Sequence, residues 1–140
     1  MKTIYTAEAL ATGGGRDGHT RTADGTLSLD LAVPKEMGGT GNGANPEQLF
    51  AAGYAACFHS ALQMVARQAR KDLGESSVGA RVGIGPNDAG GFGLEVTLEV
   101  VIPGLPQDEA QELADAAHQV CPYSNATRGN IDVHVTVVQD

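Results

Sequence analysis

The chain has 140 residues, of which 41% are hydrophobic and only 4% are aromatic. This length and composition are typical of one globular domain that buries its own core without a disulfide or a metal, so we expect a single domain over residues 1–140. The formal net charge of -8 excludes the usual basis of DNA or RNA binding, which is an excess of Lys and Arg.

The first third of the sequence is typical of β-structure. We expect a strand over residues 3–11, then a hairpin with Asp24-Gly25 as its turn and residues 27–33 as its second strand. Between the first strand and the hairpin lies a loop, residues 13–18, that contains four glycines. These glycines permit close backbone approaches that a side chain would block.

Asn45, Pro46 and Glu47 predict the start of a long helix, because Asn caps a helix, Pro fits its first turn and an acid there suits the helix dipole. We expect this helix to run to about Asp72. The small residues of the segment 51–56 allow another element to approach closely, and Cys57 should be buried in mid-helix.

The second half of the sequence predicts a hairpin, a helix and a closing strand. Val96, Leu98 and Val100 share one face of a strand, opposite glutamates. Pro122 ends the second helix, because proline disfavours the helical conformation in the residue before it. The resulting order β-β-β-α-β-β-α-β predicts an α+β domain. Its later elements are strands over 77–84 and 93–102 joined by a turn over 87–91, a helix over 107–120, a polar turn over 125–130 and a strand over 131–137.

We expect no segment that spans a membrane. The most apolar stretch, residues 49–64, is interrupted by polar side chains and is shorter than the roughly 20 residues that a spanning helix needs. The first ten residues contain no apolar run of the signal-peptide type. We therefore expect a soluble, cytoplasmic protein that does not contact membranes. In a reducing compartment, pairing of the two cysteines would be catalytic rather than structural.

Cys57 and Cys121 are the candidates for chemistry. Their separation of 64 positions does not fit the paired spacing of zinc knuckles, so no metal site is expected. Each also has a structural interpretation, since free cysteines are often buried as small hydrophobic residues. Cys121 favours a functional role, because it lies at a helix end where a modest shift would bring its sulfur toward another thiol.

A buried Cys57 needs a cation or hydrogen-bond donors to form a thiolate near neutral pH. Arg16 is the candidate cation, because it is held in the glycine loop, whereas most other basic residues fit a solvated helix end. A carboxylate would have to orient the guanidinium, and Glu47 is a candidate. In the competing interpretation, Glu47 is only an acid in the first helical turn that stabilises the helix dipole, and on spacing alone that interpretation is favoured.

Ten residues separate Glu47 from Cys57, which is about 15 Å along a continuous helix. Either the helix is interrupted, or Glu47 and Arg16 meet Cys57 across a subunit boundary. We therefore predict a homodimer with shared active sites. His59 is the histidine nearest in sequence to Cys57, but two helical positions turn it about 200° away, so we do not expect it to be catalytic.

The motifs around both cysteines resemble a known family. Residues 45–58, Asn-Pro-Glu-Gln-Leu-Phe-Ala-Ala-Gly-Tyr-Ala-Ala-Cys-Phe, are similar to the first cysteine motif of organic hydroperoxide resistance (Ohr) proteins of the OsmC/Ohr superfamily. Residues 120–132 resemble the second cysteine motif of that family, and residues 12–18 resemble its arginine loop. The likeness spans essentially the whole chain. It implies an OsmC-like α+β fold with antiparallel sheets and a long central helix, in an intertwined homodimer.

The resemblance also implies an activity, in which Cys57 reduces alkyl or fatty-acid hydroperoxides to alcohols and Cys121 captures the oxidised sulfur as a disulfide. Arg16 and Glu47 would be the activating pair. An external dithiol, a dihydrolipoyl group on a lipoylated protein, would reduce the enzyme, with no bound metal, flavin or haem. Two alternatives remain: a redox-sensing or ligand-binding module that uses the same cysteines without turnover, and a structural domain in which they only pack.

Overall fold

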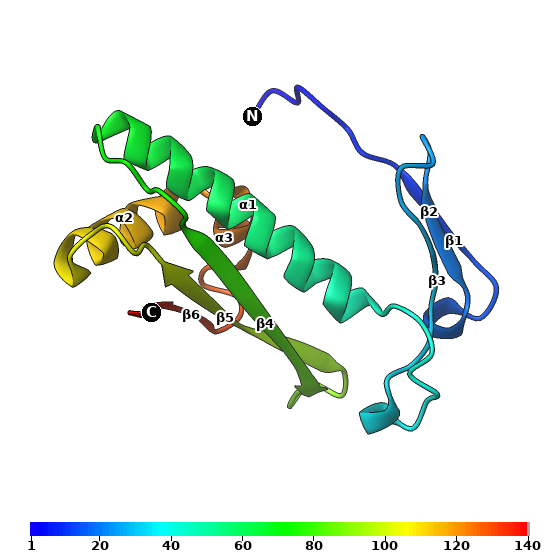
Figure 1. Ribbon diagram of the computed structural model, residues 1–140. Helices are drawn as coiled ribbons and strands as arrows, with labels where there is room; N and C mark the ends of the chain where they lie inside the picture. The colour runs from blue at the N-terminus through cyan, green and yellow to red at the C-terminus, as the bar shows by residue number, and fades with distance from the viewer. Residues whose placement is uncertain (140) are drawn as a thin grey trace. The chain divides into compact units, whose positions relative to one another are not determined.

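A computed structural model describes residues 1–139 of the protein (Figure 1). The chain forms two compact units: the first covers Met1–Leu49 and the second begins at Phe50. Each unit contains one three-stranded sheet, and the second also contains most of a long helix, α1. Two small sheets and a long helix confirm the predicted α+β class. The single domain over residues 1–140 stays a prediction.

The first unit is an antiparallel meander. Its predicted turn is confirmed, because Gly25 has a φ of 75° and its N–H donates to the Thr22 carbonyl at 3.0 Å. The first strand begins only at Ala9 rather than near residue 3, because its partner strand ends at Thr22, where the turn starts. The elements are β1 (Ala9–Thr12), the 3-10 helix η1 (Gly15–Asp17), β2 (His19–Thr22), β3 (Ser28–Asp30) and the 3-10 helix η2 (Lys35–Met37).

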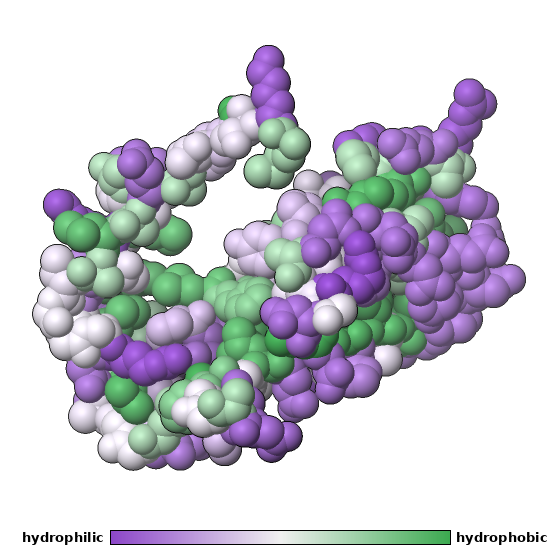
Figure 2. Space-filling model, turned by 180° about the vertical axis from the view of Figure 1, so that it is seen from behind, coloured by the Kyte–Doolittle hydropathy of each residue, from purple (hydrophilic) through white to green (hydrophobic). Residues whose placement is uncertain are grey.

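Hydrophobic side chains reach the surface of the molecule, some of them on the face seen in Figure 2. In the first unit, the adjacent residues Ile4 and Tyr5 are 96% and 77% exposed. In the second unit, Phe92 is 72% exposed. Adjacent large apolar side chains left in water favour contact with another molecule.

The sheet of the second unit has the strand order β4-β5-β6. Its strands are β4 (Ser77–Pro86), β5 (Phe92–Val101) and β6 (Val133–Val137). The prediction of antiparallel sheets is correct for the first unit and for the β4–β5 hairpin, but β6 pairs with β5 in parallel. The parallel pair follows from the helical crossover between these strands, which returns the chain to the end of the sheet where β5 begins.

Helix α1 (Pro46–Gln68) begins where the sequence predicts. The Gln48 N–H donates to the Asn45 side chain at 2.8 Å, and the Gln48 side chain accepts from the Asn45 N–H at 3.1 Å, which is a reciprocal cap. The helix ends four residues before the predicted Asp72, because the chain turns into the left-handed region at Arg70, with a φ of 57°. By length and composition alone α1 could cross a membrane, a criterion that core helices of soluble proteins also meet.

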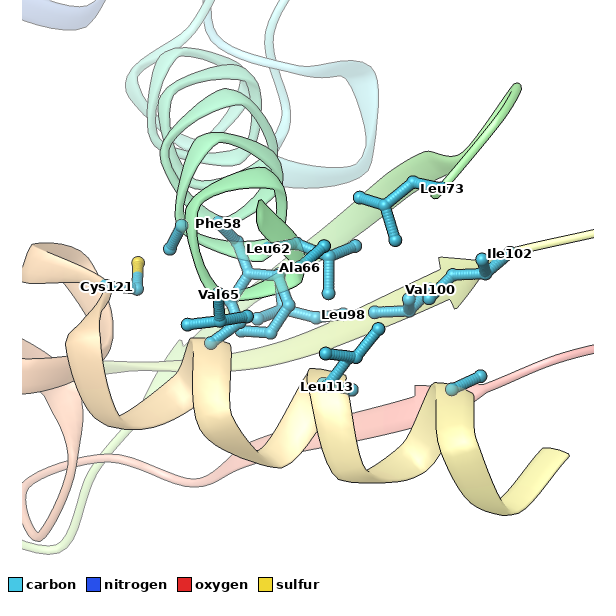
Figure 3. Close-up of a cluster of buried hydrophobic side chains, with 14 of the residues drawn as sticks. Phe58, Leu62, Val65, Ala66, Leu73, Leu98, Val100, Ile102, Leu113 and Cys121 are labelled. Atoms are coloured by element: carbon cyan, nitrogen blue, oxygen red, sulfur yellow. The ribbon is translucent and has the colours of Figure 1, made fainter. Parts of the chain in front are cut away.

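One apolar core holds the second unit together. Phe58, Leu62 and Val65 of α1 meet Leu98 of β5 and Leu113 of a second long helix, α2 (Gln107–Val120) (Figure 3). The predicted alternation along β5 is confirmed, since the three residues 96, 98 and 100 are completely buried. These contacts fix α1 and the segment after α2 against the same core, and the two cysteines lie on those elements.

Helix α2 (Gln107–Val120) has the predicted bounds, but a further helix, α3 (Pro122–Thr127), replaces part of the polar turn expected over residues 125–130. Cys121 between them is extended, with φ -63° and ψ 123°. Pro122 ends α2, as expected, and at the same time starts α3, because proline is well suited to the first helical position.

Candidate active site

The two cysteines lie side by side in the second unit. Cys57 is on α1 and half-buried, whereas Cys121 is fully buried at the junction of α2 and α3. The Cys121 thiol donates to the Cys57 sulfur, with 3.7 Å between the sulfurs. A disulfide needs about 2 Å, so a shift of less than about 2 Å would join them. The structure thus brings together the two thiols selected from the sequence, while their catalytic roles stay a prediction.

Small residues on α1 allow α3 to approach, as expected. A Cβ atom added to Gly53 would lie 2.9 Å from the Tyr123 hydroxyl, which is closer than real Cβ contacts. Tyr123 also packs edge-on against Tyr54 and Phe50, with ring centroids 5.5 and 6.0 Å apart. The turn of α1 that precedes Cys57 therefore packs among aromatic rings, which suits an apolar substrate.

The surroundings of Cys57 in its own unit hold it in the thiol form. Burial raises the pKa of Cys57 above its ordinary value, and the neighbouring Cys121 raises it further. The backbone N–H of Tyr123 donates to the sulfur and opposes these effects. One backbone donor does not outweigh burial here, so a reactive thiolate requires a further positive group.

Arg16 and Glu47 form a bidentate ion pair in the first unit. Both guanidinium NH2 nitrogens donate to the Glu47 carboxylate at 2.7 Å. The Glu47 side chain is 13% exposed and that of Arg16 is 36% exposed. The pairing expected from the sequence is therefore present, and Glu47 also occupies the first turn of α1, so both interpretations of this residue fit its position.

The glycine loop fixes the backbone that carries Arg16. A Cβ atom at Gly18 would lie 2.1 Å from the Thr12 carbonyl oxygen, so only glycine fits there. The neighbouring Asp17 accepts a hydrogen bond from the Val33 N–H at 3.1 Å. The close approach predicted from these glycines is confirmed, and it aims Arg16 from a constrained loop.

The ion pair predicts a pH-dependent stability. Hydrogen bonds from Arg16 hold the pKa of Glu47 below its ordinary value, against the opposing effect of burial. A lowered folded-state pKa contributes stability above the unfolded pKa, and this is lost as the pH falls through the folded pKa. Glu47→Gln should therefore lower the free energy of unfolding at neutral pH by roughly 1 kcal/mol, since solvent screens the exposed guanidinium.

Urea denaturation of both proteins from neutral pH down to about pH 3 measures this effect. The difference in unfolding free energy should shrink as Glu47 becomes protonated in the folded protein. A difference that stays constant over the whole range would show that the carboxylate charge is not its cause.

A buried polar cluster near the cysteines was not predicted from the sequence. The Tyr54 hydroxyl lies 2.9 Å from the Ser124 hydroxyl and 3.1 Å from the Thr127 hydroxyl. The Ser124 hydroxyl also lies 2.8 Å from Nδ1 of His118. The available signal was Tyr54 itself, three positions before Cys57 on a core-facing helix, because a buried tyrosine hydroxyl needs a partner.

The other histidines make different contacts. His59 pairs with the Ser76 hydroxyl at 2.9 Å, while His19 lies on β2. His19 bridges Asp30 and Ser28 at 2.8 and 2.9 Å. This order resembles a catalytic triad, but the Asp30 side chain is 91% exposed, whereas a triad relies on a buried aspartate. The line therefore fits a surface contact between β2 and β3.

Residues 1–139 contain no candidate metal site, since no group of three or more His, Cys, Asp or Glu side chains lies close enough together to bind an ion. Independence from metals and cofactors stays a prediction.

Comparison with known proteins places the chain in a family. The family model of OsmC-like proteins matches residues 39–136. The organic hydroperoxide resistance protein of Xanthomonas axonopodis pv. citri is 55% identical over 138 residues, which cover 97% of this chain and 96% of the relative. The crystal structure of an organic hydroperoxide resistance protein from Elizabethkingia anophelis has a TM-score of 0.95 at 55% identity, with 100% of both chains covered. That of OhrB from Bacillus subtilis has a TM-score of 0.87 at 45% identity, covering 97% of this chain and 100% of the other. The chain therefore belongs to the OsmC-like family and, within it, to the organic hydroperoxide resistance proteins.

Proposed function

We propose that this protein is a thiol peroxidase that reduces organic hydroperoxides to alcohols, with Cys57 as the attacking residue and Cys121 as the resolving residue. The distance of 3.7 Å between the two sulfurs supports this most directly, because a half-buried thiol lies within easy reach of a second, buried one. The aromatic rings of Phe50 and Tyr123 near the site favour substrates with an apolar organic group.

The reaction proceeds in two steps. The Cys57 thiolate attacks the terminal oxygen of the hydroperoxide ROOH, the O–O bond breaks, and the alkoxide leaves and takes a proton as the alcohol ROH. Cys57 is then a sulfenic acid. The Cys121 sulfur attacks that sulfur, the S–O bond breaks, and the products are a Cys57–Cys121 disulfide and water.

A dithiol must then reduce the disulfide by thiol exchange, which regenerates both thiols and converts the dithiol to its own disulfide. The family resemblance favours a dihydrolipoyl group on a lipoylated protein. The chemistry requires no metal, flavin or haem, because the peroxide supplies the oxidising equivalents. A cytoplasmic location suits a cycle that begins from two reduced thiols.

Arg16 and Glu47 would activate Cys57 from a second subunit of a homodimer. Helix α1 continues without interruption from Pro46 to Gln68, which leaves the subunit boundary as the remaining way to bring Glu47 to a thiol ten residues along the helix. The exposed apolar pair Ile4 and Tyr5 also favours a covering partner. The partner's Arg16 would stabilise the Cys57 thiolate and donate to the peroxide, while the partner's Glu47 orients the guanidinium.

A peroxidase assay coupled to dihydrolipoamide tests the proposal, with tert-butyl hydroperoxide and hydrogen peroxide as alternative substrates. We expect steady turnover that favours the organic peroxide, since the site is bordered by aromatic rings. A redox-sensing module would form the disulfide once but would not turn over. A structural domain would form no disulfide under mild peroxide treatment. Mass spectrometry of the treated protein would distinguish the disulfide form from the two free thiols.

A further inference from the structure

A hydrogen-bonded network of four side chains joins α1 to the end of α2 and to α3, the two helices that flank Cys121. Tyr54 comes from α1, His118 from the end of α2, and Ser124 and Thr127 from α3. Tyr54 and Ser124 are completely buried, and Thr127 is nearly so. The hydroxyls of Tyr54 and Ser124 have no access to bulk water, so they depend on partners within the protein for their hydrogen bonds.

The hydrogens of this network can run in either of two directions. The Thr127 hydroxyl lies 3.0 Å from the Tyr123 carbonyl and 3.3 Å from the Ser124 carbonyl. If it donates to one of these carbonyls, Tyr54 donates to Thr127, Ser124 donates to Tyr54 and His118 Nδ1 donates to Ser124. If Thr127 donates to Tyr54 instead, Tyr54 donates to Ser124 and Ser124 donates to His118 Nδ1.

Burial lowers the pKa of His118 below its ordinary value, which favours the neutral ring at pH 7. Nδ1 of the neutral ring can donate or accept, so it suits either direction. In both directions each hydroxyl donates its hydrogen to a partner in the protein. Such a satisfied buried network fixes one arrangement of its elements, because any displacement leaves a polar group unpaired.

The element that this network fixes is α3, which has only six residues. Cys121 immediately precedes α3, and the Tyr123 N–H in its first turn donates to the Cys57 sulfur. Gly53 provides the space for Tyr123 on the same helix that bears Tyr54 and Cys57. The position of α3 on α1 therefore sets the distance between the two sulfurs.

We propose that Tyr54 is a positioning residue for the resolving step, whose hydroxyl docks α3 on α1 and thereby holds Cys121 within reach of the oxidised Cys57; this rests on the proposed peroxidase function. The Cys57 sulfenic acid has two fates. Attack by Cys121 gives the disulfide and water, whereas a second hydroperoxide converts the sulfenic acid to a sulfinic acid and releases an alcohol. The network favours the first fate.

Tyr54→Phe removes the hydroxyl and keeps the ring. The full-length reduced protein is treated with increasing tert-butyl hydroperoxide, quenched with an alkylating agent and separated by mass into disulfide and sulfinic forms. Both products arise from the same sulfenic acid, so their ratio does not depend on the rate of the first attack. We expect the peroxide concentration that gives equal amounts to fall about tenfold in the variant, the factor that corresponds to one buried hydrogen bond.

Matched variants separate positioning from stability. Thr127→Val also breaks the network and should shift the ratio in the same direction, while Thr127→Ser keeps the hydroxyl and should stay near the wild type. Leu113→Ala creates a cavity on α2 outside the network, so it should lower the thermal midpoint without shifting the ratio. If Leu113→Ala shifts the ratio as much as Tyr54→Phe does, general loosening accounts for the effect and the inference is wrong.

Different results would contradict the peroxidase function and the positioning role of Tyr54. Wild-type protein that never forms the disulfide contradicts the peroxidase function and this inference with it. Wild-type protein that forms the disulfide, with an unchanged ratio in both Tyr54→Phe and Thr127→Val, contradicts the inference alone.

Discussion

Replacing Cys57 with serine should reduce peroxide consumption to the uncatalysed background. A serine hydroxyl is far less nucleophilic than a thiolate at neutral pH, and the remaining cysteine, Cys121, is fully buried. The measurement is the disappearance of tert-butyl hydroperoxide with excess dihydrolipoamide. Full activity in Cys57→Ser would refute the assignment of the attacking sulfur and the enzyme proposal with it.

Cys121→Ser should behave differently, because it removes the resolving sulfur and leaves the attacking one. We expect one rapid turnover per subunit, followed by a trapped sulfenic acid that further peroxide converts to sulfinic acid. A dimedone adduct of Cys57, detected by mass spectrometry, would identify the trapped species. Sustained turnover with dihydrolipoamide would instead mean that the external dithiol reduces the sulfenic acid directly and that Cys121 is dispensable.

The sequence predicted best the elements that have strong local signals. Helix α2 has the predicted bounds, since Pro106 and Pro122 flank an amphipathic segment. Helix α3 was missed because a proline was interpreted only as a stop, although it is equally suited to begin a helix. The predicted start of β1 was wrong for another reason. Residues before Ala9 have the composition of a strand, but a strand also needs a partner strand, and pairing depends on residues distant in the sequence.

The sequence likewise predicted only part of the candidate site. Cys57, Cys121, Arg16 and Glu47 were selected by residue type and motif, and the structure pairs them as two sulfurs and as one ion pair. The Tyr54 network was not predicted, because Ser124 and Thr127 lie 70 and 73 positions after Tyr54 in the chain, and serine and threonine have many ordinary roles. These hydroxyls come within hydrogen-bonding distance of one another only because α3 packs on α1.

Arg16→Ala should slow the attack of Cys57 on peroxide by about 10²–10³-fold, the usual cost of losing one preorganised donor. In its own unit Cys57 has a raised pKa, so without the guanidinium its alkylation by iodoacetamide should require a higher pH than in the wild type. The free energy of unfolding should fall by roughly 1 kcal/mol, as for Glu47→Gln, because both changes break the same part-exposed ion pair and neither removes a core side chain. Equal reactivity and an equal pH profile in the variant would remove Arg16 from the mechanism.

The same variant tests whether the site is shared between subunits. Mixed dimers of a Cys57→Ser subunit and an Arg16→Ala subunit can be isolated by co-expression with two affinity tags. If the partner supplies Arg16, each mixed dimer contains one complete site, formed by the cysteine of one subunit and the arginine of the other, and activity should return to about half that of the wild-type dimer. If Arg16 acts within its own chain, neither site is complete, and the mixed dimer should be no more active than Arg16→Ala alone. Recovery of activity therefore requires a guanidinium that crosses the subunit boundary, which is the arrangement that an uninterrupted α1 favours.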